Sequence, residues 1–111
     1  MRQTPADHAA LLAEELERLK RELTAMGAER IVLFGSYARG RADAFTDLDL
    51  MVVMESDRPF VERLGELYRR LAPRVAVDIL AYTPEEWQKI QETPFVRRAL
   101  EEGSIHEADA E

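Results

Sequence analysis

The sequence of 111 residues contains no cysteine, no asparagine and only two lysines. The lack of cysteine excludes disulfide bonds and thiolate metal sites. No apolar run approaches the roughly 18 residues that a membrane span requires. Residues 1–20 also contain no apolar secretory core. Together these absences predict a cytoplasmic protein that has no membrane partner.

Basic charge is also scarce, because 22 acidic residues outnumber 15 basic ones and give a formal net charge of −7. Proteins that bind nucleic-acid backbones normally cluster lysine and arginine on their surface. The acidic balance therefore argues against direct nucleic-acid binding. It remains compatible with a small nucleotide, whose charge a metal ion can neutralise, and with a basic protein partner.

Apolar residues form 46% of the chain, which is enough for a folded core. We expect one domain over residues 1–111, with a frayed tail at residues 107–111. The hydrophobic periodicity predicts elements in the order α, β, β, α, β, α, α, and a short edge strand could follow. This order predicts an α+β fold in which a small mixed β-sheet has helices packed on one face.

Three aspartates occupy unusual positions in the predicted strands, namely Asp47, Asp49 and Asp78. Aspartate is depleted in strands because its charged side chain resists burial. Side chains alternate along a strand, so Asp47 and Asp49 should point to the same face. If the strand that carries Asp78 pairs alongside, three carboxylates gather there and repel one another. A divalent cation removes this repulsion, and Mg²⁺ prefers such oxygen ligands.

Each of these aspartates has a simpler interpretation when it is taken alone. An Asp-x-Asp sequence is most often a solvated strand end. Asp78 could be a charge that protects an edge strand from aggregation.

A glycine-containing turn follows the first predicted strand, and its first two residues are Gly35 and Ser36. Glycine lets backbone N–H groups approach a phosphate closely, and Ser36 adds a hydroxyl group. A following helical turn would direct its positive end towards the anion. Arg39 and Arg41 could bind phosphate oxygens, or they could instead pair with nearby carboxylates such as Asp43.

The spacing of these two motifs is more specific than either motif alone. Gly35 and Ser36 are followed by ten residues and then by Asp47, Leu48 and Asp49. This pattern resembles the G-S-x10-D-x-D signature of the minimal nucleotidyltransferase family, within the DNA polymerase beta-like nucleotidyltransferase superfamily. The similarity to that family extends over roughly the middle half of the chain. It is carried by two sequence segments, Phe-Gly-Ser-Tyr-Ala-Arg-Gly and then Thr-Asp-Leu-Asp-Leu.

The resemblance implies a polymerase beta-like fold with a site for Mg²⁺ and a nucleotide donor. The donor implied by the family is ATP. The Gly-Ser turn would bind the triphosphate, and the chemistry of its guanidinium group makes Arg39 a further candidate for the nucleotide site. Asp47 and Asp49 would bind Mg²⁺, and Asp78 would complete a two-metal site and orient or deprotonate the acceptor hydroxyl. One departure is Thr46, where the family commonly has serine, but the hydroxyl group is kept.

The resemblance also implies an acceptor, because small members of this family often act as antitoxins beside a HEPN-domain ribonuclease toxin. They transfer AMP to a tyrosine hydroxyl of the toxin. We expect this partner here, because the short chain after Asp78 offers no separate domain for a small acceptor. Two alternatives remain open. One is transfer to a small molecule, with a homo-oligomer that builds the acceptor site between subunits. The other is a nucleotide-binding antitoxin that does not catalyse.

Overall fold

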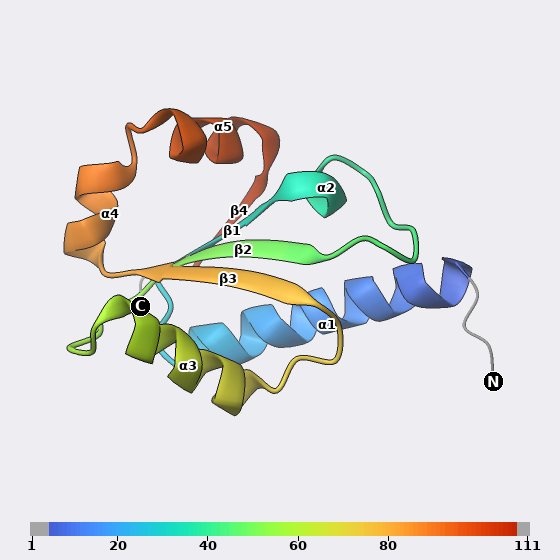
Figure 1. Cartoon of the computed structure of the whole chain (residues 1–111), viewed down its shortest axis with the longest axis horizontal. Helices are drawn as coiled ribbons and strands as arrows, with labels where there is room; N and C mark the ends of the chain where they lie inside the picture. The colour runs from blue at the N-terminus through green and yellow to red at the C-terminus, as the bar shows by residue number, and fades with distance from the viewer. Residues whose placement is uncertain (1–4, 109–111) are drawn as a thin grey trace.

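The computed structural model describes residues 5–108 of the chain. This part of the chain forms five helices and four strands, which Figure 1 labels. In chain order they are α1 (Pro5–Ala25), β1 (Arg30–Phe34), α2 (Gly35–Ala38), β2 (Leu48–Val53), α3 (Phe60–Leu71), β3 (Val77–Tyr82), α4 (Pro84–Ile90), α5 (Pro94–Glu102) and β4 (Ser104–Glu107). Most of the expected frayed tail, from residue 109 onwards, lies outside the described residues, whereas Glu107 ends β4.

The four strands form one mixed sheet in the order β3-β2-β1-β4. β1 runs antiparallel to both β2 and β4, whereas β2 and β3 are parallel and are connected through α3. The predicted α+β class and mixed sheet are therefore confirmed, and so is the short edge strand. Within the described residues, no helix combines the length and the apolar character that a membrane span requires.

One face of the sheet is covered by α1 and α3, which lie side by side below it in Figure 1. The apolar residues of α1 recur at helical spacing and are buried there: Leu12, Leu16, Leu19 and Leu23. They pack on alternate residues of the central strands and on Leu67 and Leu71 of α3. The periodic spacing of leucines in the sequence thus corresponds to the largest helix–sheet layer.

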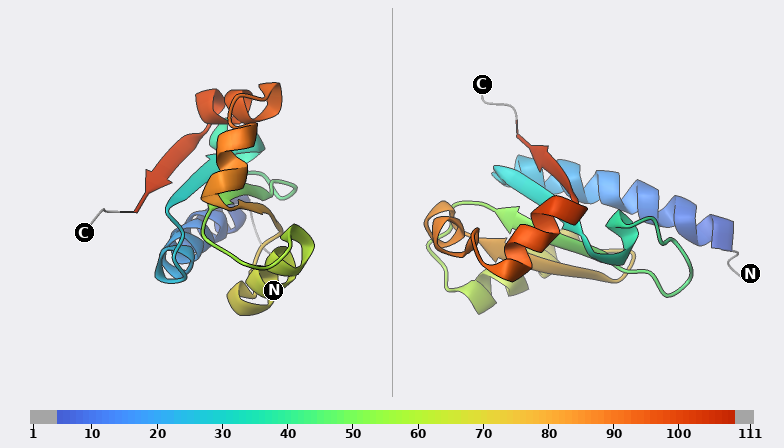
Figure 2. Two further views of the ribbon diagram at one scale, coloured as in Figure 1. Left: turned by 90° about the vertical axis from the view of Figure 1, so that its left-hand side faces the viewer. Right: turned by 90° about the horizontal axis from the view of Figure 1, so that it is seen from above.

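The other face carries α4 and α5, as the end-on view in Figure 2 shows. Val32, Met51 and Val53 of the sheet are buried there against Trp87 of α4 and against α5. Helices therefore lie on both faces rather than on one, which corrects the prediction from the sequence. The physical reason is that β2 is apolar on both sides after its first residues, so its second face also requires cover.

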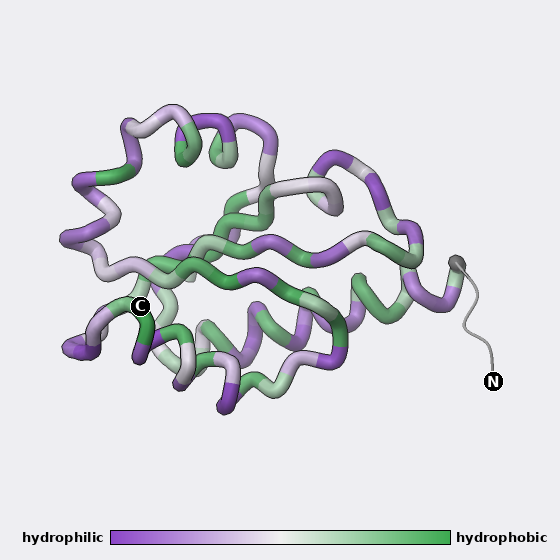
Figure 3. The backbone as a smooth tube through the Cα atoms, in the orientation of Figure 1, coloured by the Kyte–Doolittle hydropathy of each residue, from purple (hydrophilic) through white to green (hydrophobic). Residues whose placement is uncertain are grey.

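Hydropathy along the backbone follows this layering. In Figure 3 the central strands contain the main hydrophobic stretches, and the long helices alternate between hydrophobic and hydrophilic turns. The apolar sides of those helices face the sheet, and burial of these sides is the main force that holds the layers together.

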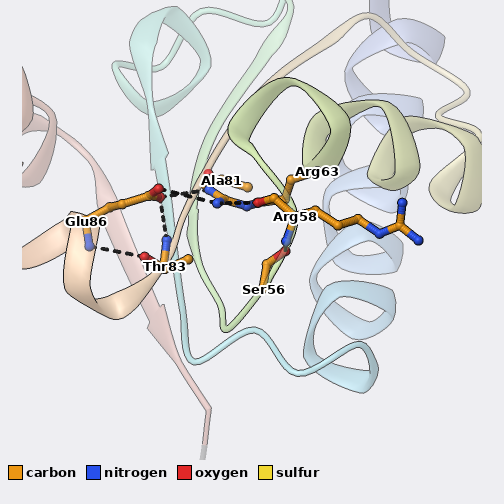
Figure 4. A network of polar contacts seen from close by, with 6 residues as sticks. All are labelled: Ser56, Arg58, Arg63, Ala81, Thr83 and Glu86. Carbon is orange, nitrogen blue, oxygen red and sulfur yellow. Dashed lines mark hydrogen bonds and ion pairs between the residues drawn. The ribbon is translucent and has the colours of Figure 1, made fainter.

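A buried arginine joins α3, β3 and α4 (Figure 4). Arg63 is only 5% exposed. Its Nη1 donates to the Ala81 carbonyl at 2.7 Å and to Glu86 at 2.8 Å, and its Nη2 donates to the Arg58 carbonyl at 2.9 Å. Glu86 also closes a capping box with Thr83 at the start of α4. Arg63 therefore fixes a helix on one face of the sheet to a helix on the other.

A buried glutamate on α1 secures the connection that leads into β3. Glu15 is 1% exposed and accepts hydrogen bonds from the Arg18 guanidinium at 2.6 and 2.8 Å and from the Arg74 backbone N–H. Arg18 also donates to the Leu71 carbonyl at 2.8 Å. The Arg18 hydrogen bond lowers the pKa of the Glu15 carboxyl. This network holds the loop between α3 and β3 against α1.

Candidate active site

Asp49 lies at the centre of the acidic cluster because of the strand register. Its Cα partner on β1 is Phe34, and its Cα partner on β3 is Asp78. Residues that are paired across neighbouring strands place their side chains on the same face. Asp47 precedes β2 by one residue and keeps the alternation with Asp49. The structure thus brings together the three aspartates that the sequence singled out.

The electrostatics of Asp49 show how closely these carboxylates interact. Asp49 is half-buried, whereas Asp47 and Asp78 are exposed. Burial raises the pKa of the Asp49 carboxyl, and the carboxylates of Asp78 and Asp47 raise it further. The positive charge of Arg39 lowers this pKa and so opposes the increase. The cluster is therefore a concentration of negative charge that a cation would stabilise.

The three carboxylates do not form a ready-made metal site. Within residues 5–108, no group of three or more His, Cys, Asp or Glu side chains is already arranged to hold a metal ion. Mg²⁺ does not require such a cage, because it is usually held by one or two carboxylates together with waters and substrate phosphates. A set of carboxylate oxygens, without histidine or cysteine, matches that hard cation. The donor residues thus fit Mg²⁺, and its remaining ligands must come from substrate and water.

The Gly35 turn lies directly against Asp49. Gly35 has a φ of +77°, in the left-handed region that favours glycine. A Cβ atom at this position would overlap the Asp49 carboxylate and would lie 2.9 Å from its Cγ atom. A single helical turn is present as α2, but it begins at Gly35 itself rather than after Ser36. The Ser36 hydroxyl has no hydrogen-bond partner within residues 5–108, so it remains available to a ligand.

The two arginines of the turn have different surroundings. The Arg39 guanidinium lies 3.4 Å from the Glu102 carboxylate at the end of α5, and both side chains are exposed. Arg41 pairs with Asp43 at 2.6 Å. Both arginines therefore pair with a carboxylate, as the alternative interpretation expected, and Arg39 is the one whose charge also acts on Asp49.

The loop before Asp47 is held by hydrogen bonds around Thr46. Thr46 is buried, and its hydroxyl accepts from the Asp43 backbone N–H at 3.0 Å. The same hydroxyl donates to the Asp43 carboxylate at 3.2 Å, which also accepts from the Phe45 N–H at 2.9 Å. The threonine in place of the family's serine thus positions the loop, and its methyl group is accommodated. An aspartate three residues before a threonine is a local turn pattern that could have indicated this role.

Residues of α5 also border the site, and none of them was predicted from the sequence. Glu102 pairs with Arg39, and the Phe95 ring contacts the Phe34 ring at a centroid distance of 5.7 Å. Both contacts join segments that are about 60 residues apart, so no local pattern could have revealed them.

One cavity lies away from the aspartates. Its volume is about 750 Å³, and its lining includes Arg30, Val53 and Trp87. Arg30 begins β1 and Val53 ends β2, whereas Asp49 and Phe34 lie at the opposite ends of these two strands. The candidate site therefore lies at the opposite end of these strands from this cavity.

The sequence model of the nucleotidyltransferase domain family matches residues 13–106 of the chain. The chain belongs to this family. The match covers both motifs and every strand except the last residue of β4. Curated protein sequences include no significant match to this nucleotidyltransferase domain.

Solved structures of similar proteins have the same fold. A Sulfolobus solfataricus protein described as a nucleotidyltransferase superposes on this nucleotidyltransferase domain with a TM-score of 0.59 and 18% identity, covering 83% of this chain and 85% of that chain. A mutant of the toxin–antitoxin pair MntA–HpeT superposes with a TM-score of 0.56 and 21% identity, covering 87% of this chain and 72% of that chain. A protein described as a minimal nucleotidyltransferase superposes with a TM-score of 0.55 and 27% identity, covering 85% of this chain and 93% of that chain. The nucleotidyltransferase domain thus has the polymerase beta-like fold.

Proposed function

We propose that this domain transfers AMP from ATP to a tyrosine hydroxyl of a HEPN-type ribonuclease toxin and thereby acts as its antitoxin. One observation carries the catalytic part of the proposal. Asp49 lies in register between Phe34 and Asp78, and the backbone of Gly35 lies against its carboxylate. A phosphate-binding turn and an acidic cluster therefore meet at a single point of the sheet.

The chain's own residues suit distinct roles at this point. Asp47 and Asp49 would hold Mg²⁺ in a two-metal type of site that Asp78 completes. The backbone of the Gly35 turn and the free Ser36 hydroxyl would bind the phosphates of ATP. When bound, Mg²⁺ would neutralise the triphosphate and favour departure of pyrophosphate.

The reaction is an in-line displacement at the α-phosphorus of ATP. A bond forms between the acceptor oxygen and this phosphorus, while the bond from the phosphorus to the bridging oxygen breaks. Pyrophosphate leaves with that oxygen. The proton of the acceptor hydroxyl passes to a base, and Asp78 is the candidate because it is exposed beside Asp49. The acceptor would therefore approach from the β3 side of Asp49.

Two features support a protein acceptor of this kind. The net charge of −7 suits a partner with a basic surface, and a ribonuclease requires such a surface to bind RNA. The MntA–HpeT pair, which has a related fold at 21% identity, is a toxin–antitoxin pair. Identity at that level is evidence for the fold alone, so the partner is part of the proposal.

Label transfer tests the proposal directly. The domain is incubated with Mg²⁺ and ATP labelled at the α-phosphate, with and without the protein encoded by its neighbouring gene. Label is expected on a tyrosine of that protein, as identified by mass spectrometry. The Asp47→Asn variant should not transfer label. Asp57→Asn is the matched control, because Asp57 is an exposed aspartate in the loop between β2 and α3.

The remaining outcomes separate the alternatives. Label on small molecules alone would contradict the antitoxin proposal and favour a small-molecule acceptor. Binding of Mg²⁺–ATP without transfer to any acceptor would indicate a non-catalytic nucleotide-binding module. Equal transfer by the Asp47→Asn variant would show that Asp47 has no role in the chemistry.

A further inference from the structure

The rotation of α5 on the sheet is fixed by two buried residues. Val96 and Ala99 pack on the sheet face that contains Val32. In a helix, residues seven positions apart lie on the same side, so Phe95 and Glu102 share one flank of α5. This flank is next to the surface that packs on the sheet.

Both ends of that flank contact residues beside the candidate site. The Phe95 ring meets the Phe34 ring edge-to-face, with an interplanar angle of 87°. Glu102 lies 3.4 Å from Arg39. Phe34 is the register partner of Asp49 and directly precedes Gly35 in the chain. The flank of α5 therefore borders the site on its β1 side, on the same side of the sheet as α2 in Figure 1.

Phe95 remains 55% exposed although it is held by this aromatic contact. Single exposed apolar residues are common on protein surfaces, so exposure alone indicates nothing. The surroundings of Phe95 are more informative, because an edge-to-face contact with Phe34 restricts the ring orientation. An aromatic ring whose orientation is already restricted loses little conformational freedom when another ring stacks on it.

We infer that Phe95 is the surface on which the base of the donor nucleotide stacks. This inference rests on the proposed function. The acceptor approaches from the side of Asp78, which leaves the β1 side of Asp49 for the nucleotide. A triphosphate bound at the Gly35 turn would lie next to Phe34, whose ring contacts the ring of Phe95. A base has an aromatic face of its own, and stacking on a protein ring is sequence-tolerant.

A second exposed phenylalanine borders the site and provides the matched control. Phe45 is 84% exposed on the loop before Asp47. It makes no ring contact within residues 5–108, so its orientation is not restricted in the same way. Removal of either ring deletes the same chemical group, but only removal of the Phe95 ring should weaken binding of the base.

Calorimetric titration of the full chain with two probes tests the inference. One probe is Mg²⁺ with a non-hydrolysable ATP analogue, and the other is Mg²⁺ with inorganic tripolyphosphate, which has no base. Phe95→Ala should weaken binding of the ATP analogue roughly tenfold, as expected for loss of one stacked base. It should leave tripolyphosphate binding unchanged, and Phe45→Ala should change neither affinity. Phe95→Tyr should restore binding of the ATP analogue, whereas Phe95→Leu should not.

Several results would overturn the inference. These are unchanged affinity of Phe95→Ala for the ATP analogue, equal loss of affinity for both probes, or the tenfold loss in Phe45→Ala instead. Restoration by leucine would show that Phe95 only packs against Phe34. Failure of the wild-type chain to bind either probe would overturn the proposed function itself. Thermal unfolding of each variant confirms that it is folded, which is expected because the ring is exposed.

Discussion

Gly35 lies so close to the Asp49 carboxylate that the position has no room for a Cβ atom. Its φ of +77° also disfavours any residue except glycine. The glycine turn and the acidic strand are therefore in direct contact. The close approach connects two motifs that are separated in the sequence by the whole Arg41–Thr46 loop.

Gly35→Ala should disrupt this contact. The added Cβ must displace either the turn or the Asp49 carboxylate, and the alanine must also adopt an unfavourable φ. We expect a loss of at least about 2 kcal/mol in the free energy of unfolding and loss of nucleotidyl transfer. Gly27→Ala is the matched control, because Gly27 has a φ of +103° but no atom within 4 Å of its Cβ position. That variant should lose only about 1 kcal/mol and remain active. Equal effects of the two substitutions would show that backbone strain alone matters.

Asp49→Asn should abolish transfer without harming the metal-free protein. Burial and two neighbouring carboxylates raise the pKa of the Asp49 carboxyl in the folded state above its unfolded value. Ionised Asp49 therefore opposes folding at neutral pH. This effect begins to shrink as the pH falls through the folded pKa, and it is gone only below the unfolded pKa. The variant should melt at the same temperature as the wild type or higher at pH 7, and the difference should shrink in acid.

The same variant should also lose the increase in melting temperature that Mg²⁺–ATP produces in the wild type. Transfer should fall at least about 100-fold. A large decrease in the melting temperature of the metal-free variant would indicate instead that Asp49 is a structural residue.

Arg39→Ala should weaken ATP binding about five- to tenfold, because it removes a charge that can contact phosphate oxygens. Glu102→Gln should not weaken ATP binding, since the exposed pair between Arg39 and Glu102 contributes little and releases Arg39 when broken. Arg69→Ala is a control that removes the same charge from α3, on the other face of the sheet. Titration of Mg²⁺–ATP measures all three variants. Equal losses in Arg39→Ala and Arg69→Ala would indicate only a general effect of net charge.

Glu15→Gln should reduce both the stability of the protein and its sensitivity to acid. The hydrogen bond from Arg18 lowers the pKa of the Glu15 carboxyl below its ordinary value of 4.5. Glu15 therefore stabilises the fold above pH 4.5, and this contribution is lost as the pH falls from there through the lower, folded-state pKa. At pH 7 the variant should lose roughly 2 kcal/mol, because the buried Glu15 carboxylate also accepts the Arg74 N–H.

The matched control for this prediction is Glu17→Gln. Glu17 also pairs at i,i+3, with Lys20 at 3.1 Å, but its side chain is 61% exposed. This variant should change stability by less than about 0.5 kcal/mol. Urea unfolding at pH 7 and in acid compares the variants. An unchanged pH dependence in Glu15→Gln would show that Glu15 is not the acid-sensitive group.

The strand pattern allowed part of the site to be predicted. Alternation along one strand was enough to place Asp47 and Asp49 on one face. The position of Asp78 beside them depended on the pairing of β2 with β3. From the sequence alone, this pairing could be assumed but not predicted. The roles assigned to these residues, and to Gly35, Ser36 and Arg39, remain predictions that the variants above test.

The second helical layer was the main failure of the prediction. Trp87 and Val96 belong to short segments whose apolar residues indicate helices but not the face on which each helix packs. The continuous apolar stretch of β2 is compatible with cover on one face or both, because a buried strand loses its clear alternation. That ambiguity can be resolved only when the whole sheet is assembled.

Features that depend on neighbours along the chain could be read directly from the amino-acid order. These are the helical spacing of leucines in α1, the alternation of Asp47 with Asp49, and the distance along the chain from the glycine turn to the aspartates. Three contacts became visible only in the folded chain: Asp49 against Gly35, Arg39 paired with Glu102, and the Phe95 ring against the Phe34 ring. Local periodicity is set by backbone geometry within a few residues. Contacts between distant segments form because the apolar faces of all the elements must be buried together, and this requirement fixes their positions relative to one another.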